Sequence, residues 1–330
     1  MTPVFVTGGS GLIGGALVAR LIKADNDVVA LARSDAAAAK LEAAGARTVR
    51  GDVLDEAALT DGMRGCGLVY HLAGINTFCP TDPAALFHVN VRGAEIAVRA
   101  AHAAGARRIV LTSSSSSLGE VRGSVGTEDS PHRGSYMSVY ERSKHEGELA
   151  AFAAARSAGI ELVAVLPSSV QGPGRAGGTG RILIAYLNGK LKAFVDTRIS
   201  LVDIDDAVEG HVLAAQRGQP GERYLISGAT ITSHEALELV SRISGVQRDV
   251  RFLPAFAARA VGAAVELGFR ARGRKPPVCR EMINTMLHGH HYDGSRAAAE
   301  LGLRYTPVED TFRRTIEWAR AEGLVHAGTG

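Results

Sequence analysis

Residues 4–15 read Val-Phe-Val-Thr-Gly-Gly-Ser-Gly-Leu-Ile-Gly-Gly, and this stretch decides the fold. Its first three residues form a short apolar run typical of a buried β-strand. A glycine-rich turn follows and opens into a helical pattern with Leu17 and Leu21 on one face. Glycine at this spacing allows a tight turn, close approach of a pyrophosphate to the backbone, and packing of helix on strand. The stretch therefore predicts a strand–turn–helix unit that binds a dinucleotide at the helix N-terminus.

Composition excludes several classes of partner. The chain has 330 residues, 46% apolar and 22% charged, which are values of an ordinary globular protein. Its 37 basic and 34 acidic residues leave a net charge of +3, which favours neither nucleic acid nor an anionic membrane. We therefore expect a small-molecule partner and no nucleic acid.

The three cysteines, Cys66, Cys79 and Cys279, lie far apart and form no Cys-x-x-Cys pair. This spacing predicts neither a disulfide framework nor a zinc site and suits a reducing cytosol. The chain begins a strand almost at once, so we expect no signal peptide and a cytoplasmic location. The apolar stretch 252–269 contains charged residues, which predicts a core or interface helix and no stable membrane span.

Apolar strand patterns alternate with helical patterns through the first half of the chain, which predicts an α/β fold with a Rossmann doubly wound parallel sheet. After residue 182 the alternation weakens, as in a smaller C-terminal α/β substrate-binding lobe. We expect a dinucleotide-binding domain over 1–170 and a mainly substrate-binding lobe over 171–330, with about 195–215 returning to the Rossmann sheet. The short strands expected after residue 182 are 199–202, 223–226 and 250–252.

Arg33 follows the second strand, 28–32, about 20 residues after the glycines. An acidic residue at this position holds the ribose hydroxyls of NAD, whereas an arginine fits the 2′-phosphate of NADP. The residue therefore favours NADP(H) over NAD as cofactor, although a solvated surface arginine is the alternative.

Tyr140 and Lys144 are four positions apart and share one face of a helix. A phenol has a pKa of about 10, and a neighbouring ammonium lowers it. A serine run, 113–117, follows the strand 108–112 and can supply a hydroxyl to a substrate carbonyl. These groups together could bind a carbonyl, protonate its oxygen and accept hydride from NADPH at its carbon.

Other polar residues leave alternatives open. Asp52 could accept from the adenine amino group or cap the following helix, and Asp205 and Asp206 could form an acid–base pair or cap a helix. Arg175 and Arg181 lie in a glycine-rich loop, where they are either solvated or meet an anionic substrate.

His288, His290 and His291 resemble a metal cluster. No cysteine or carboxylate stands at ligand spacing from them, so we expect no metal site.

These motifs resemble those of the extended short-chain dehydrogenases/reductases, the NAD-dependent epimerase/dehydratase family, over nearly the whole chain. Within it the chain is similar to the dihydroflavonol-reductase-like and hopanoid-associated sugar-epimerase-like branch. The stretches that carry the resemblance are 7–14, 51–53, 71–74, 112–114, 140–144, 166–173, 201–207 and 292–302.

The resemblance implies catalytic roles for Ser114, Tyr140 and Lys144, with Ser116 as a further substrate contact. It also implies a set of cofactor contacts that runs from the pyrophosphate to the carboxamide. These are Gly8, Gly11, Leu12 and Ile13 at the pyrophosphate, Asp52 and Val53 at adenine, Leu72, Ala73 and Gly74 along the ribose, and Pro167 and Val170 near the carboxamide. Two departures, Asp203 where many members have histidine and Gly74 in place of a second alanine, concern the substrate end.

The expected function is an NADP(H)-dependent oxidoreductase that reduces a ketone or aldehyde, or oxidises the alcohol. One alternative is a nucleotide-sugar epimerase with retained NAD. Another is a non-enzymatic NADP(H) redox sensor, a class that commonly loses the tyrosine or lysine. The resemblance further implies a homodimer through helices 90–103 and 140–155, and the apolar region 252–291 favours a hydrophobic substrate.

Overall fold

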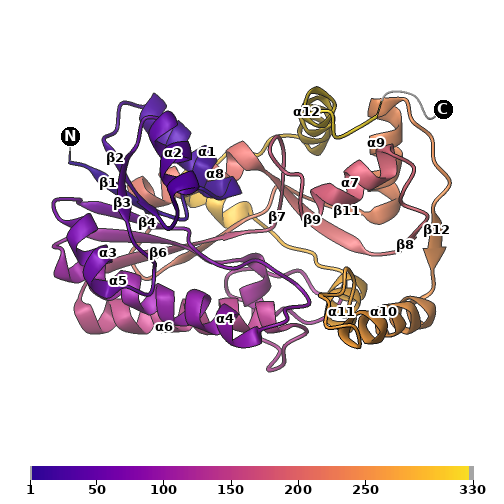
Figure 1. Cartoon of the computed structure of the whole chain (residues 1–330), viewed down its shortest axis with the longest axis horizontal. Coiled ribbons are helices and arrows are strands. Elements are labelled where there is room, and N and C mark those ends of the chain that lie inside the picture. The colour runs from indigo at the N-terminus through magenta and orange to yellow at the C-terminus, as the bar shows by residue number, and fades with distance from the viewer. Residues whose placement is uncertain (1, 327–330) are drawn as a thin grey trace.

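A computed structural model describes residues 2–326, and its centre is a seven-stranded parallel sheet (Figure 1). The strand order is β10-β6-β5-β4-β1-β2-β3, so the order reverses between β1 and β4. Ligands of such sheets bind at this reversal, beyond the carboxyl ends of the strands. The strands are β1 (Val4–Thr7), β2 (Val28–Ala32), β3 (Arg47–Arg50), β4 (Leu68–His71), β5 (Arg108–Thr112), β6 (Glu161–Pro167) and β10 (Arg223–Ile226). The predicted doubly wound α/β sheet is confirmed.

Helices cover both faces of this sheet, which explains why its central strands are apolar without alternation (Figure 1). One face packs against α1 (Leu12–Lys23), α2 (Asp35–Ala43) and α8 (Ile204–Arg217). The other packs against α3 (Glu56–Met63), α5 (Gly93–Ala103) and α6 (Val139–Ala158). Three short elements complete this part: α4 (Pro83–Phe87), the π-helical turn η1 (His88–Arg92) and the 3-10 turn η2 (Ser115–Leu118).

The smaller lobe lies beyond the carboxyl ends of the large sheet (Figure 1). Its strands are β7 (Ser169–Gln171), β9 (Arg198–Asp203) and β11 (Ala229–Thr232), which form a mixed sheet, and the parallel pair β8 (Ala193–Val195) and β12 (Arg251–Leu253). Its helical elements are α7 (Gly180–Leu187), α9 (Ser233–Ser244), α10 (Ala255–Arg270), α11 (Arg280–His288), the π-helical turn η3 (Ala297–Leu301) and α12 (Val308–Ala321).

The prediction for 223–226 was wrong about its sheet. These residues form β10, which pairs in parallel with β6 at the edge of the large sheet. The preceding α8 also packs on the large sheet, whereas β9 belongs to the small one. A short run such as Arg-Tyr-Leu-Ile shows that a strand exists but carries no information about which sheet it joins.

The cysteine prediction was also wrong. Cys79 and Cys279, 200 positions apart, form a disulfide, while Cys66 is free and buried. The bond ties the loop after β4 to the residue that precedes α11. The cysteines therefore give no support to a reducing compartment, and the cytoplasmic location stays a prediction.

Helix α10 has two unlike faces. Ala258 and Gly262 are buried, and Gly262 lies against Ile283 of α11, whereas Phe256 and Leu267 are 75% and 73% exposed. None of the helices over residues 2–326 is long and apolar enough to cross a membrane.

Candidate functional site

The glycine turn lies between β1 and α1, at the reversal of strand order. Gly8 has φ +72°, and a Cβ there would come within 2.6 Å of the Ala73 nitrogen. A Cβ on Gly14 would come within 2.2 Å of the Gly8 carbonyl oxygen, so both positions require glycine. Gly11 donates to that oxygen at 3.0 Å and caps α1 without a side-chain bond. The N–H groups of the first helical turn, at Leu12 and Ile13, are thus left for an anion.

Two cations stand beside this turn. Arg33 follows β2 and is exposed, and Lys40 on α2 donates from Nζ to the Ser10 carbonyl at 3.0 Å. Ser34 between them caps α2 by accepting from the Ala37 nitrogen. Sequence reasoning found Arg33 but missed Lys40, because a lysine on a helix surface carries no signal of what it faces.

Asp52 does not cap the next helix, so that alternative is wrong. Its carboxylate accepts from the Leu54 nitrogen at 3.0 Å, while Asp55 caps α3 by accepting from the Ala58 nitrogen. Val53 beside it is buried.

The segment Leu72–Gly74 runs from β4 past the glycine turn, and Ala73 donates to the Thr7 hydroxyl at 3.2 Å. Asn90 in η1 fixes the next residue, Ile75, by accepting from its nitrogen at 2.7 Å and donating to its oxygen at 3.0 Å. A Cβ on Gly74 would lie 3.1 Å from the Asn90 amide oxygen, so an alanine there would require a small shift of Asn90. Asn90 is a positioning residue that the sequence analysis did not identify.

The structure brings Ser114, Ser116 and Tyr140 together. The two serine hydroxyls lie 2.7 Å apart in the turn after β5. Tyr140 lies in the first turn of α6, which Ser138 caps by accepting from Glu141. The pKa of Tyr140 is raised because the phenol is buried. Hydrogen bonds with the two serines and the charge of Arg175 act in the opposite direction but are weaker. The phenol therefore holds its proton at neutral pH.

The predicted lowering of the Tyr140 pKa by Lys144 differs from what the structure shows. The Lys144 ammonium donates to the Thr112 carbonyl at 2.9 Å, at the end of β5. Burial lowers the pKa of Lys144 to about 8, with Glu148 acting in the opposite direction. His71, also buried, contacts the Thr7 hydroxyl at 3.0 Å, and burial and Lys144 lower its pKa to about 3. Lys144 is thus a poorly solvated cation near the strand ends.

Of the two loop arginines, Arg175 turns inward and Arg181 is exposed. The guanidinium of Arg175 lies against Gly178, where a Cβ would come within 2.5 Å of it, and a Cβ on Gly180 would lie 2.0 Å from the Arg175 carbonyl oxygen. Its Nε is buried without a hydrogen-bond partner among residues 2–326. A guanidinium held beside Tyr140 in this way can meet an anionic group of a ligand.

Pro167 ends β6, and Val170 in β7 is buried. Between them, the Ser168 hydroxyl is buried and has no hydrogen-bond partner within the part of the chain that the structure describes. This segment follows the carboxyl end of β6, and its contact with the carboxamide stays a prediction.

The aspartates at the start of α8 have structural partners. Asp203 caps α8 and accepts a hydrogen bond from the Thr311 hydroxyl. Arg314 forms ion pairs with both Asp203 and Asp205. Asp206 accepts from the nitrogen and hydroxyl of Thr306. They therefore join α8 to the C-terminal segment, and no acid–base pair forms.

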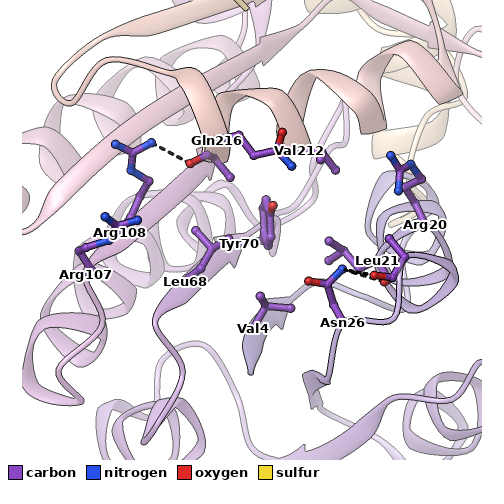
Figure 2. A pocket seen from close by; sticks show the side chains of 12 residues that line it. Val4, Arg20, Leu21, Asn26, Leu68, Tyr70, Arg107, Arg108, Val212 and Gln216 are labelled. Atoms are coloured by element: carbon purple, nitrogen blue, oxygen red, sulfur yellow. Dashed lines mark hydrogen bonds between the residues drawn. The ribbon is translucent and has the colours of Figure 1, made fainter. Parts of the chain in front are cut away.

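A cavity of about 500 Å³ lies away from these residues (Figure 2). It opens at the amino ends of β1, β4 and β5, where Val4, Leu68 and Arg108 line it. It contains none of the predicted site residues, which lie at the carboxyl ends of the strands.

Comparisons with known proteins agree with this arrangement. Residues 4–227 match the NAD dependent epimerase/dehydratase family. A Synechocystis sp. protein named as a candidate dihydroflavonol 4-reductase is 30% identical over 97% of this chain and 95% of its own length. The 2-alkyl-3-oxoalkanoate reductase of Shewanella oneidensis is 29% identical over 94% of this chain and 84% of that protein.

The solved structure of a nucleoside-diphosphate-sugar epimerase from Pseudomonas aeruginosa superposes with a TM-score of 0.78 at 25% identity, covering 98% of this chain and 99% of that one. The relatives therefore include reductases and sugar epimerases, and a nicotinamide dinucleotide is the cofactor typical of them. The chain belongs to the NAD-dependent epimerase/dehydratase family, within the extended short-chain dehydrogenases/reductases.

Proposed function

We propose that the protein is an NADP(H)-dependent reductase of a ketone, with Tyr140 as the proton donor. The observation that carries this proposal is the grouping of Ser114 and Ser116 around a phenol whose pKa is raised. A group that must give a proton to a carbonyl oxygen has to hold that proton before hydride arrives.

Each of the proposed catalytic residues has a separate role in the reaction. Ser114 donates a hydrogen bond to the carbonyl oxygen, and Tyr140 transfers its proton there. The reduced nicotinamide would supply hydride to the carbonyl carbon when bound, and the start of α1 fits its pyrophosphate because no side chain caps the helix N–H groups there. Lys144 would hold the ribose hydroxyls and stabilise the phenolate that forms, using the two N–H donors that its bond to the Thr112 carbonyl leaves free.

The preference for NADP(H) rests on the cations beside the glycine turn. Arg33 is exposed directly after β2, and Lys40 donates to the Ser10 carbonyl of the glycine turn, so both cations are available to a 2′-phosphate. An acidic residue, which would bind the free ribose hydroxyls of NAD, is not at position 33.

The proposed substrate is a hydrophobic ketone with an anionic group. Arg175 places an incompletely bonded guanidinium beside Tyr140, and the name of one relative, 2-alkyl-3-oxoalkanoate reductase, specifies a ketone with a carboxylate and alkyl chains. A charge-assisted hydrogen bond to the carboxylate would add about 1.5–3 kcal/mol to binding.

Paired substrates test this proposal: an oxoalkanoate and its methyl ester, followed by NADPH oxidation. We expect Arg175→Met to raise KM for the acid by about 10- to 100-fold and to leave the ester nearly unchanged. Arg181→Met, on the same loop but exposed, is the matched control. Equal losses for acid and ester would show that Arg175 does not bind the anionic group.

A nucleotide-sugar epimerase with retained NAD remains the second candidate, because one similar solved structure is an epimerase. The redox-sensor alternative is disfavoured because Tyr140 and Lys144 are both present. A small-molecule carbonyl or alcohol is the proposed partner, and a homodimer through α5 and α6 stays a prediction.

A further inference from the structure

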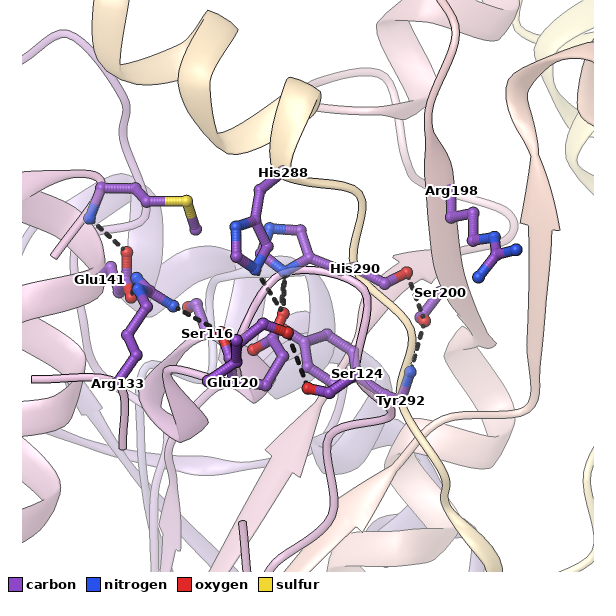
Figure 3. Close-up of polar contacts among 12 residues, drawn as sticks. Ser116, Glu120, Ser124, Arg133, Glu141, Arg198, Ser200, His288, His290 and Tyr292 are labelled. Atoms are coloured by element: carbon purple, nitrogen blue, oxygen red, sulfur yellow. Dashed lines mark hydrogen bonds and ion pairs between the residues drawn. The ribbon is translucent and has the colours of Figure 1, made fainter. Parts of the chain in front are cut away.

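The histidines near the end of α11 acquire a carboxylate partner in the folded chain. His288 ends α11, and Gly289, with φ +73°, turns the backbone so that His290 faces the same point. Both imidazoles point at Glu120, which follows η2 (Figure 3). His290 Nδ1 lies 2.6 Å from Glu120 Oε1, and His288 Nε2 lies 3.5 Å from the same oxygen.

Glu120 is buried, both histidines are partly buried, and two atoms of the group lack hydrogen-bond partners. The side chains of Glu120 and His288 are 2% and 8% exposed. Glu120 Oε2 and His288 Nε2 have no hydrogen-bond partner among residues 2–326. Buried carboxylate and imidazole atoms rarely lack partners. A ligand that accepts electron pairs from the carboxylate and from the imidazole would supply the missing interaction.

We propose that Glu120, His288 and His290 bind a divalent metal ion of the zinc class. One oxygen and two nitrogens lie within 4.8 Å of one another, and two histidines with one glutamate form an established set of three protein ligands for zinc. The Tyr292 hydroxyl, 2.9 Å from His290 Nδ1, is a further oxygen atom beside the cluster. The nearby Arg133, which donates to the Glu120 carbonyl, has its charge matched by Glu141.

The metal would join parts of the chain that are far apart. Glu120 lies at the end of the serine turn that carries Ser114 and Ser116, whereas the histidines belong to the smaller lobe. Backbone bonds between Gly126 and the segment 291–293 already hold these regions together. A bound ion would therefore fix the smaller lobe against the serine turn without touching the proposed reacting atoms.

Zinc titration of the chelator-treated, tag-free full chain tests this proposal. The probe is ZnCl₂ at about 10 μM free zinc, with bound metal measured by mass spectrometry after dialysis and Tm measured alongside. We expect one equivalent of zinc and a Tm that rises with zinc concentration. Co²⁺ in place of zinc should give the visible absorption of a tetrahedral site.

Four variants locate the site. Glu120→Gln and His290→Gln should each weaken zinc binding by more than about tenfold. His288→Gln should do the same and is the variant most certain to fold, because its Nε2 makes no hydrogen bond within the described chain. His291→Ala removes the neighbouring imidazole outside the cluster and should bind zinc as the wild type does. Absence of zinc binding, or equal binding by all four variants, would overturn the proposal.

Discussion

Tyr140→Phe should lower kcat for ketone reduction by about a hundred- to ten-thousand-fold while the affinity for NADPH stays nearly the same. The substitution removes the proton donor but keeps the ring, which lies 5.8 Å from the Phe78 ring. NADPH affinity, measured by fluorescence titration, separates this loss from damage to the cofactor site, whose glycine turn and cations belong to other elements.

Tyr136→Phe provides the matched control. Tyr136 is also a tyrosine close to the start of α6, but it is 39% exposed and packs against His132 and His145. The Tyr136→Phe variant should reduce the ketone with the kcat of the wild type. Retained turnover in Tyr140→Phe would contradict the assignment of Tyr140 as proton donor.

Arg33→Asp should reduce the preference for NADPH over NADH by about 10- to 100-fold, measured as the ratio of the two kcat/KM values. The change removes a charge-assisted bond to the 2′-phosphate and provides an acceptor for the ribose hydroxyls of NADH. Adding Lys40→Met should shift the ratio further, since its ammonium lies 3.0 Å from the Ser10 carbonyl of the glycine turn.

Arg107→Asp is the matched control, because it makes the same change of charge at the amino end of β5, on the side of the sheet away from the glycine turn. Its selectivity should equal that of the wild type. An unchanged ratio in the Arg33 and Lys40 double variant would mean that neither residue binds the 2′-phosphate.

Local patterns made much of this structure predictable. The glycine turn is recognisable within residues 4–15, because Gly14 lies against Gly8 inside the same strand–turn–helix unit and Gly8 lies against the residues that follow the adjacent strand. The spacing of Tyr140 and Lys144 likewise fixes their common helix face. Both patterns are visible in short stretches of sequence, so the fold class and the order of the candidate site residues could be predicted, although the close approach of Gly8 to Ala73 joins distant segments.

Features that depend on distant partners could not be predicted in the same way. The disulfide joins cysteines 200 positions apart, and Glu120 meets His290 across 170 positions. Neither spacing corresponds to a local motif. The Arg175 guanidinium lies against Gly178, and the Lys144 ammonium donates to a strand carbonyl that the helix pattern does not indicate.

Transfer of deuterium from (4-²H)NADPH tests the central claim most directly. NADPH labelled on each face of the nicotinamide is tested in turn. With the label on the reactive face, the account predicts that each turnover forms one NADP⁺ and one alcohol that carries deuterium on the former carbonyl carbon. An enzyme that inverts a nucleotide sugar with tightly held NAD, and that incorporates no deuterium from added NADPH, would contradict it.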